Sequence, residues 1–183
     1  MMSLILVFLF AFPVFAQEKT VNVMEAPHLA KGDGVTDDTA AIASALAAGL
    51  EIYFPTGHVF LTDGHEISTP KKITCGQQAT IKQRPNNLAP GSQEQVFAFN
   101  PGSEGSVLEG CLIDGNRDAA KPTYTTNEWA CLTINAPYLT IRDVEVQECT
   151  TTGLNGRSLD PKHNLSIDHL SIHDSGLGVT LKH

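Results

Sequence analysis

Two basic side chains, Arg157 and Lys182, occupy equivalent positions in two similar short apolar segments, residues 153–157 and 178–182. If these segments form neighbouring strands, their backbones lie about 4.8 Å apart, and Asn155 and Thr180 stack beside the two cations. On a chain with a formal net charge of -8, stacked cations suit an anionic polymer such as a polyuronate. The alternative is that both side chains only keep the sheet face soluble.

The chemistry available at such a groove depends on where the carboxyl groups lie. Removal of the proton next to a uronate carboxylate needs a base, and a cation or a neutral acid to hold the developing enolate. Hydrolysis needs two carboxyl groups about 5 to 9.5 Å apart. We expect no carboxylate to face outward on the groove strands, so the sequence assigns no catalytic residue. Asp143, Glu145 and Glu148 belong to other strands and are expected to be solvated surface residues.

Two further cations, Arg117 and Lys121, lie in a polar loop and are candidate substrate-binding residues. The loop begins with Asp114-Gly115-Asn116, a sequence typical of a turn.

His173 and Asp174 could act as a base and the group that orients it, but a turn at the end of a strand is the simpler interpretation. Asp33, Asp37 and Asp38 are of the type that binds calcium, yet capping of a helix explains them without a metal. We therefore predict no metal site from these residues.

Apolar residues recur so that similar residues fall on successive coils of a solenoid. In one set, the segments 106–113, 139–146 and 165–172 align with one another. The alignment places residues of successive coils in three stacked rows: Leu108, Ile141 and Ile167; Cys111, Val144 and Leu170; and Ile113, Val146 and Ile172. A second set of strands, 96–100, 131–135, 153–157 and 178–182, alternates with the first. Two interleaved ladders of this kind predict a parallel β-helix.

The segment from Lys31 to Thr62 predicts a glycine turn, a helix and two strands. Gly32 and Gly34 permit the turn, Thr36 or Asp37 can cap the helix, and Gly49 can end it. This order resembles the start of the pectate lyase superfamily, which includes glycoside hydrolase family 28. The resemblance implies an all-β, right-handed parallel β-helix with an N-terminal capping helix. Calcium is common in that superfamily, but no ligand set is assignable here.

Three further segments resemble the catalytic modules of mannuronan C5-epimerases: Ile113–Asp118 is similar to their LDGNRD, Thr140–Val146 to VTIERVEV, and Asn164–Ile167 to NLTIRD. Those enzymes carry a catalytic tyrosine, aspartate and histidine in the motif YGFDPHE. Here Thr152 and Asn155 stand in place of the tyrosine and the aspartate, and the histidine is unmatched. Lyase or hydrolase action on an acidic polysaccharide is therefore expected ahead of epimerisation. A non-catalytic β-helix of the tailspike or adhesin kind is the alternative from a different class.

The first sixteen residues have the features of a cleaved signal peptide, with an apolar run too short to span a bilayer. The expected product is residues 17–183, secreted or periplasmic, as the N-terminal part of a β-helix that lacks its C-terminal coils. The acidic charge argues against nucleic acid as a partner, and no membrane contact is expected after cleavage. Among the four cysteines, Cys75, Cys111, Cys131 and Cys149, pairing cannot be assigned, and Cys111 is expected to be an interior thiol.

Overall fold

The computed structural model describes residues 20–84, 95–117, 130–156 and 164–181. Short strands dominate this part of the chain, and every strand pair in it is parallel. The elements are, in order, β1 Val21–Asn22, β2 Asp33–Asp37, α1 Thr39–Ala48, β3 Glu51–Phe54, β4 Val59–Thr62, β5 His65–Ile67, β6 Lys72–Cys75, β7 Thr80–Gln83, β8 Phe97–Phe99, β9 Val107–Glu109, β10 Leu112–Asp114, β11 Ala130–Ile134, β12 Thr140–Gln147, β13 Thr152–Gly156, β14 Ser166–His173 and β15 Leu177–Leu181.

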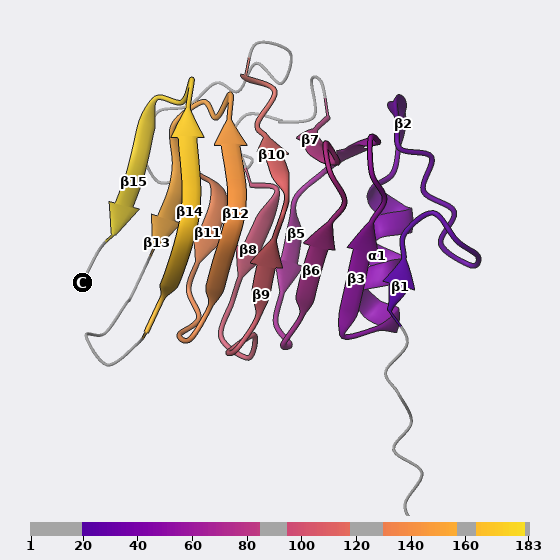
Figure 1. Cartoon of the computed structure of the whole chain (residues 1–183), viewed down its shortest axis with the longest axis horizontal. Coiled ribbons are helices and arrows are strands. Elements are labelled where there is room, and N and C mark those ends of the chain that lie inside the picture. Colours follow the sequence, from indigo (N-terminus) through magenta and orange to yellow (C-terminus); the bar gives the residue numbers. More distant parts are fainter. Residues whose placement is uncertain (1–19, 85–94, 118–129, 157–163, 182–183) are drawn as a thin grey trace, which may run out of the picture.

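The strands form two sheets whose strands follow one another along the long axis of the molecule (Figure 1). The first sheet has the order β1-β3-β6-β9-β12-β10-β7-β4-β2, and β14 also pairs with β12. The second has the order β15-β13-β11-β8-β5. Because successive coils add their strands to the sheets in order, with every pair parallel, the arrangement is consistent with a parallel β-helix or solenoid.

The first sheet is bent into two arms that meet within β12. The start of β12 pairs with β9, and its end pairs with β10. At the bend, Gly110, Asp143 and His169 adopt left-handed backbone angles, with φ of 73°, 50° and 52°. These residues turn the chain between the two arms in successive coils.

The repeat register predicted from the sequence is confirmed. Ile141 pairs with Leu108 on one side and with Ile167 on the other. In the second sheet, Leu154 pairs with Leu132 and with Val179. The interior is apolar, and its largest fully buried side chains are Phe54, Phe60, Phe97, Phe99, Ile42, Ile52, Ile73, Ile81, Leu108, Ile113, Leu132 and Ile134.

Helix α1 lies at one end of the stacked strands and buries Ile42 and Ala45 (Figure 1). Asp37 accepts a hydrogen bond from the Thr39 amide at 3.0 Å, but Asp38 occupies the N-cap position, so the prediction that Thr36 or Asp37 caps the helix is wrong. Asp38 does not cap the helix with its side chain. Its buried carboxylate instead accepts the backbone N–H groups of Lys31, at 2.6 Å, and Gly32, at 3.0 Å. The turn at Lys31 and Gly32, which precedes β2, is therefore held by Asp38.

Two disulfides join coils, Cys75 to Cys111 and Cys131 to Cys149. The prediction that Cys111 is a free thiol is wrong, although its interior position is right, since only 2% of it is exposed. The sequence shows which row Cys111 belongs to, but not that the end of β6 brings Cys75 beside it.

The predicted signal peptide, residues 1–16, lies outside the described residues. Across the described ranges, no helix is long and apolar enough to span a membrane.

Candidate functional site

The strands predicted to carry a groove do stack in the expected register. Thr133 of β11 pairs with Asn155 of β13, which in turn pairs with Thr180 of β15. These positions are less accessible than an open groove requires, because Thr133 is 8% exposed and Asn155 is 1% exposed, while Thr180 is half-buried. Asn155, predicted to lie beside the stacked cations of a groove, is therefore buried, and so is its neighbour Thr133. A binding role for Asn155 and Thr180 stays a prediction.

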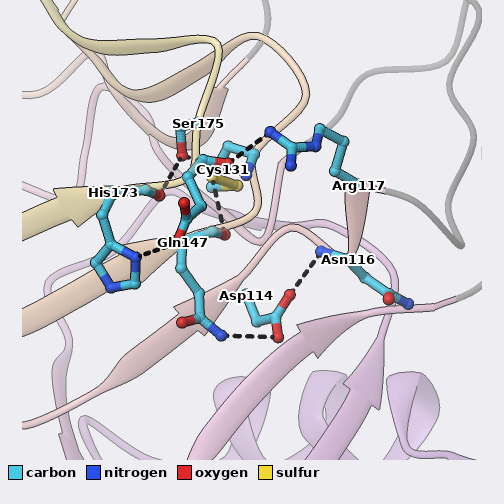
Figure 2. Close-up of a disulfide and its surroundings, with 9 residues drawn as sticks. Asp114, Asn116, Arg117, Cys131, Gln147, His173 and Ser175 are labelled. Atoms are coloured by element: carbon cyan, nitrogen blue, oxygen red, sulfur yellow. Dashed lines mark hydrogen bonds and ion pairs between the residues drawn. A yellow bond between two sulfur atoms is a disulfide. The ribbon is translucent and has the colours of Figure 1, made fainter.

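Three of the predicted cations, Lys121, Arg157 and Lys182, lie outside the described residues. Arg117 is described, and it lies at a corner between the first and second sheets. The corner is built from the turns that follow β10, β12 and β14, and Figure 2 shows Arg117 and His173 of this corner near the Cys131–Cys149 disulfide. We call it the polar corner and define it by Arg117, Glu145, Glu148, His173 and Asp174.

The three turns of the polar corner have the same backbone form. Asn116, Glu148 and Asp174 are left-handed, with φ of 52°, 53° and 50°. Backbone hydrogen bonds connect successive turns, from the Arg117 amide to the Glu148 carbonyl at 3.0 Å and from the Gly176 amide to the Cys149 carbonyl at 3.2 Å. Because each turn is hydrogen-bonded to the turn of the next coil, side chains from three coils lie close together at this corner.

Arg117 reaches across these turns. Its Nη1 donates to the Asp174 carbonyl oxygen at 2.7 Å, and its Nη2 lies 3.4 Å from Glu148 Oε2. The side chain remains 39% exposed, so the guanidinium is both anchored and accessible to a ligand. Planar guanidinium groups suit carboxylates, which they bind with two parallel hydrogen bonds.

His173 lies between two carboxylates. Its Nε2 is 2.7 Å from Glu145 Oε1, and its Nδ1 is 2.8 Å from Asp174 Oδ2 (Figure 2 labels His173). The hydrogen bond to Glu145, followed by that to Asp174, raises the pKa of His173 above its ordinary value. The turn predicted at His173-Asp174 is present. The alternative prediction, an imidazole ring oriented by a carboxylate, is also met, because Asp174 contacts the His173 ring.

The sequence missed the role of Glu145, which was expected only to be solvated. A signal was available in the repeat alignment, because the register that pairs Val146 with Ile172 also pairs Gln147 with His173. Glu145 lies two residues before Gln147, so it is the diagonal neighbour of His173 on the same face of the sheet.

Asp114 supports the corner from the coil before. It is nearly buried, accepts the Asn116 amide at 2.7 Å, and receives Lys82 Nζ at 2.9 Å and Gln147 Nε2 at 3.1 Å (Figure 2). The predicted turn at Asp114-Gly115-Asn116 is thus confirmed. These contacts occupy the Asp114 carboxylate, so its role is to stabilise the turn and the neighbouring strands.

A small depression of about 280 Å³ lies beside the corner, lined by Thr150, Thr151, Gly176 and Leu177. Within the described ranges, no three His, Cys, Asp or Glu side chains are grouped so that they could hold a metal ion. Asp33, Asp37 and Asp38 are explained by turn and helix contacts. The described residues therefore do not supply a calcium ligand set.

Comparison with known proteins gives distant similarities, and no family model matches the chain. The chain is 26% identical over 149 residues to the pre-neck appendage protein of Bacillus phage phi29, covering 78% of this chain and 17% of that protein. It is 28% identical over 172 residues to mannuronan C5-epimerase AlgE2 of Azotobacter vinelandii, covering 81% of this chain and 16% of the enzyme. Its fold is similar to PfbA, a surface adhesin of Streptococcus pneumoniae, with a TM-score of 0.61 and 17% identity over 86% of this chain and 40% of that one. The chain thus spans about a sixth of the length of the curated relatives it matches.

Proposed function

We propose that residues 17–183 form part of a closed, right-handed parallel β-helix of the pectate lyase superfamily that acts on an acidic, uronate-containing polysaccharide. The proposal includes export after removal of residues 1–16. It also includes lyase or glycoside hydrolase chemistry as the reaction of the whole protein.

The observation that carries the proposal is the convergence of a cation and a titratable group on Asp174. Arg117 donates to the Asp174 backbone oxygen, and His173 contacts the Asp174 carboxylate. A uronate lyase needs both elements, a cation for the substrate carboxylate and a group that can exchange a proton. Of the two reactions, elimination is the better supported, because hydrolysis would need the Glu145 and Asp174 carboxyls, which both bind His173.

Similarity to a mannuronan C5-epimerase supports an acidic polysaccharide as the ligand, since mannuronan is a polyuronate. Epimerisation by those enzymes' machinery is not favoured here. Thr152 and Asn155 replace the tyrosine and the aspartate, and both are buried in β13.

Export is supported by the cysteines. All four are paired in two disulfides, and disulfides persist in oxidising compartments outside the cytosol.

A non-catalytic binding module is the second candidate. It is favoured by the match to a phage appendage protein.

The test is binding and turnover of polygalacturonate and alginate. We expect both polymers to bind more weakly as salt increases, because ionic contacts are screened. Arg117→Gln should weaken binding about tenfold, the value of one hydrogen-bonded charge pair. Ultraviolet absorbance of unsaturated uronate would establish lyase action, new reducing ends without that absorbance would establish hydrolysis, and binding without either product would favour the binding module.

Arg142→Gln is the matched control, because Arg142 has similar exposure and forms an ordinary surface ion pair with Glu109. It should leave binding unchanged. Equal affinity of the parent and Arg117→Gln would rule out the polar corner as the polysaccharide site.

A further inference from the structure

A second concave surface lies on the first sheet, over its bend and apart from the second-sheet strands. It is a depression of about 290 Å³ lined by Gln78, Ala79, Thr80, Gly110, Cys111, Leu112, Asp143 and Glu145. These residues come from three successive coils, at the β6–β7 turn, the β9–β10 turn and β12. We call this surface the bend depression.

The concavity follows from the backbone. Gln78, Gly110 and Asp143 all line the depression, and all three are left-handed, with φ of 60°, 73° and 50°. Non-glycine residues rarely adopt this conformation, and two of the three residues here are not glycine. The repeated left-handed turn bends the sheet at the same place in each coil and leaves a hollow on its surface.

The floor of the depression is held in place covalently. Cys111 lines it and is bonded to Cys75 of β6. At Gly110 the two coils approach so closely that an added Cβ would lie 2.8 Å from the Cys75 carbonyl oxygen. A surface preorganised in this way loses little conformational entropy when a ligand binds.

The lining has the chemistry of a sugar site. Ala79, Cys111 and Leu112 supply an apolar floor for the C–H face of a ring, while Gln78, Thr80, Asp143 and Glu145 supply hydrogen-bonding groups at the sides. Carboxylates accept hydrogen bonds from two neighbouring hydroxyls, and charge makes these bonds stronger than neutral ones.

The negative charge of the depression favours neutral sugars over uronates. Asp143 and Glu145 are its only charged lining residues, and both are acidic. Their exposed partners His169 and His173 lie on β14 and are not part of the lining. A uronate carboxylate would meet like charge here, whereas the hydroxyls of a neutral ring would meet acceptors.

We propose that the bend depression is a binding site for one neutral pyranose unit. It adjoins the polar corner, with which it shares Glu145, and takes a different ligand from the acidic polysaccharide proposed there. The volume is near the lower limit for ligand sites in proteins, which suits a single ring. The protein would then contact uncharged sugars in the bend depression and uronates at the adjoining polar corner.

The experiment is a titration of the isotope-labelled chain, followed by amide NMR, with methyl glycosides of mannose, galactose and glucose. Sodium glucuronate is titrated in parallel. At least one neutral glycoside should shift the amides of Gly110, Leu112 and Asp143 in a saturable way, and glucuronate should not. Absence of saturable shifts at these amides with all three neutral glycosides would overturn the proposal, as would equal shifts with glucuronate.

Asp143→Asn should weaken the neutral-sugar affinity about tenfold, since it removes the charge from the hydrogen bonds but keeps a residue that tolerates the left-handed backbone. Asp168→Asn is the matched control, because Asp168 contacts the same His169 ring, at 3.0 Å, without lining the depression. Leu112→Arg, which covers the floor with a long side chain, should abolish the shifts independently. Retained affinity in both Asp143→Asn and Leu112→Arg would contradict the assignment, whether or not the polar corner binds polyuronates.

Discussion

Two histidines show how differently the two ends of the described solenoid are held together. His65 in β5 is 6% exposed, and its Nε2 lies 2.6 Å from the Thr62 hydroxyl. Burial lowers its pKa to about 4, against the opposing influence of Asp63. His173 in β14 is accessible and lies between Glu145 and Asp174, which raise its pKa. Burial in the core favours the neutral form of His65, whereas two neighbouring carboxylates favour the charged form of His173.

The same contrast extends to the surrounding side chains. In the N-terminal coils, Phe54, Phe60 and Ile73 are fully buried. In the last described coil, Ile167, Leu177 and Val179 are 42%, 47% and 49% exposed. The backbone ladders are alike in both regions, so the hydrogen-bonded register alone does not determine how strongly a coil is held. In a solenoid, local stability follows the contacts that each coil makes with its neighbours.

The largest expected effect is the loss of an aromatic side chain from the N-terminal core. Phe60 is fully buried and contacts Phe54 edge to face, with ring centroids 5.2 Å apart. Phe60→Ala should reduce the free energy of unfolding by about 3–5 kcal/mol, through lost burial and the cavity left behind. Chemical denaturation measures this value. Ile167→Ala, in the partly exposed last coil, should cost only about 1 kcal/mol, and equal losses would break the comparison between the two regions.

A smaller effect is expected at the buried carboxylate that holds the turn before β2. Asp38→Ala leaves the amides of Lys31 and Gly32 without their acceptor, which should cost about 1–3 kcal/mol. Among the described residues, the exposed Asp168 accepts no such pair of backbone N–H groups, so Asp168→Ala should change stability by less than about 0.5 kcal/mol. Thermal unfolding of both variants checks the difference. A milder effect at Asp38 than at Asp168 would contradict the role assigned to the turn.

The smallest effect on stability is expected at His173. The direction in which its contribution changes with pH is opposite to that of His65 at the N-terminal end of the described solenoid. Because the folded pKa is raised, the folded state binds more protons than the unfolded one at neutral pH. The stabilisation is therefore complete below the unfolded pKa of about 6.5 and is lost as pH rises through the folded pKa. Amide hydrogen exchange in β14, corrected for its intrinsic pH dependence, should show less protection above that range, and His173→Gln should remove the trend.

His65 provides the internal contrast in the same experiment. Its folded pKa is lowered, so its contribution is complete above about 6.5 and is lost as pH falls toward about 4. Protection in β5 should therefore weaken with acid while protection in β14 does not. Parallel pH trends at both ends would show that the two histidines are not held as described.

Much of the architecture could be read from the sequence because it rests on local or periodic signals. The helix and the two strands between Thr39 and Thr62 follow from apolar spacing and from the residues that end each element, whereas Asp33–Asp37 forms strand β2 where only a turn was predicted. The pairing of Ile141 with Leu108 and Ile167 follows from side-chain alternation, since a shift of one residue would turn every apolar side chain outward. The turn at Asp114-Gly115-Asn116 follows from side chains that bond to their own backbone.

Other features were decided only by the tertiary structure, because they depend on which turns of different coils come into contact. Cys111 forms a disulfide because β6 ends beside it, and Asn155 is buried although its strand and register were predicted. The Asp38 carboxylate bonds to a turn that precedes it in the chain rather than to its own helix. Arg117 and His173, far apart in sequence, both reach Asp174 because the turns after β10, β12 and β14 stack. Periodicity in one chain determines the coils and their register, whereas the contacts at a corner depend on side-chain direction and loop path, which have no period.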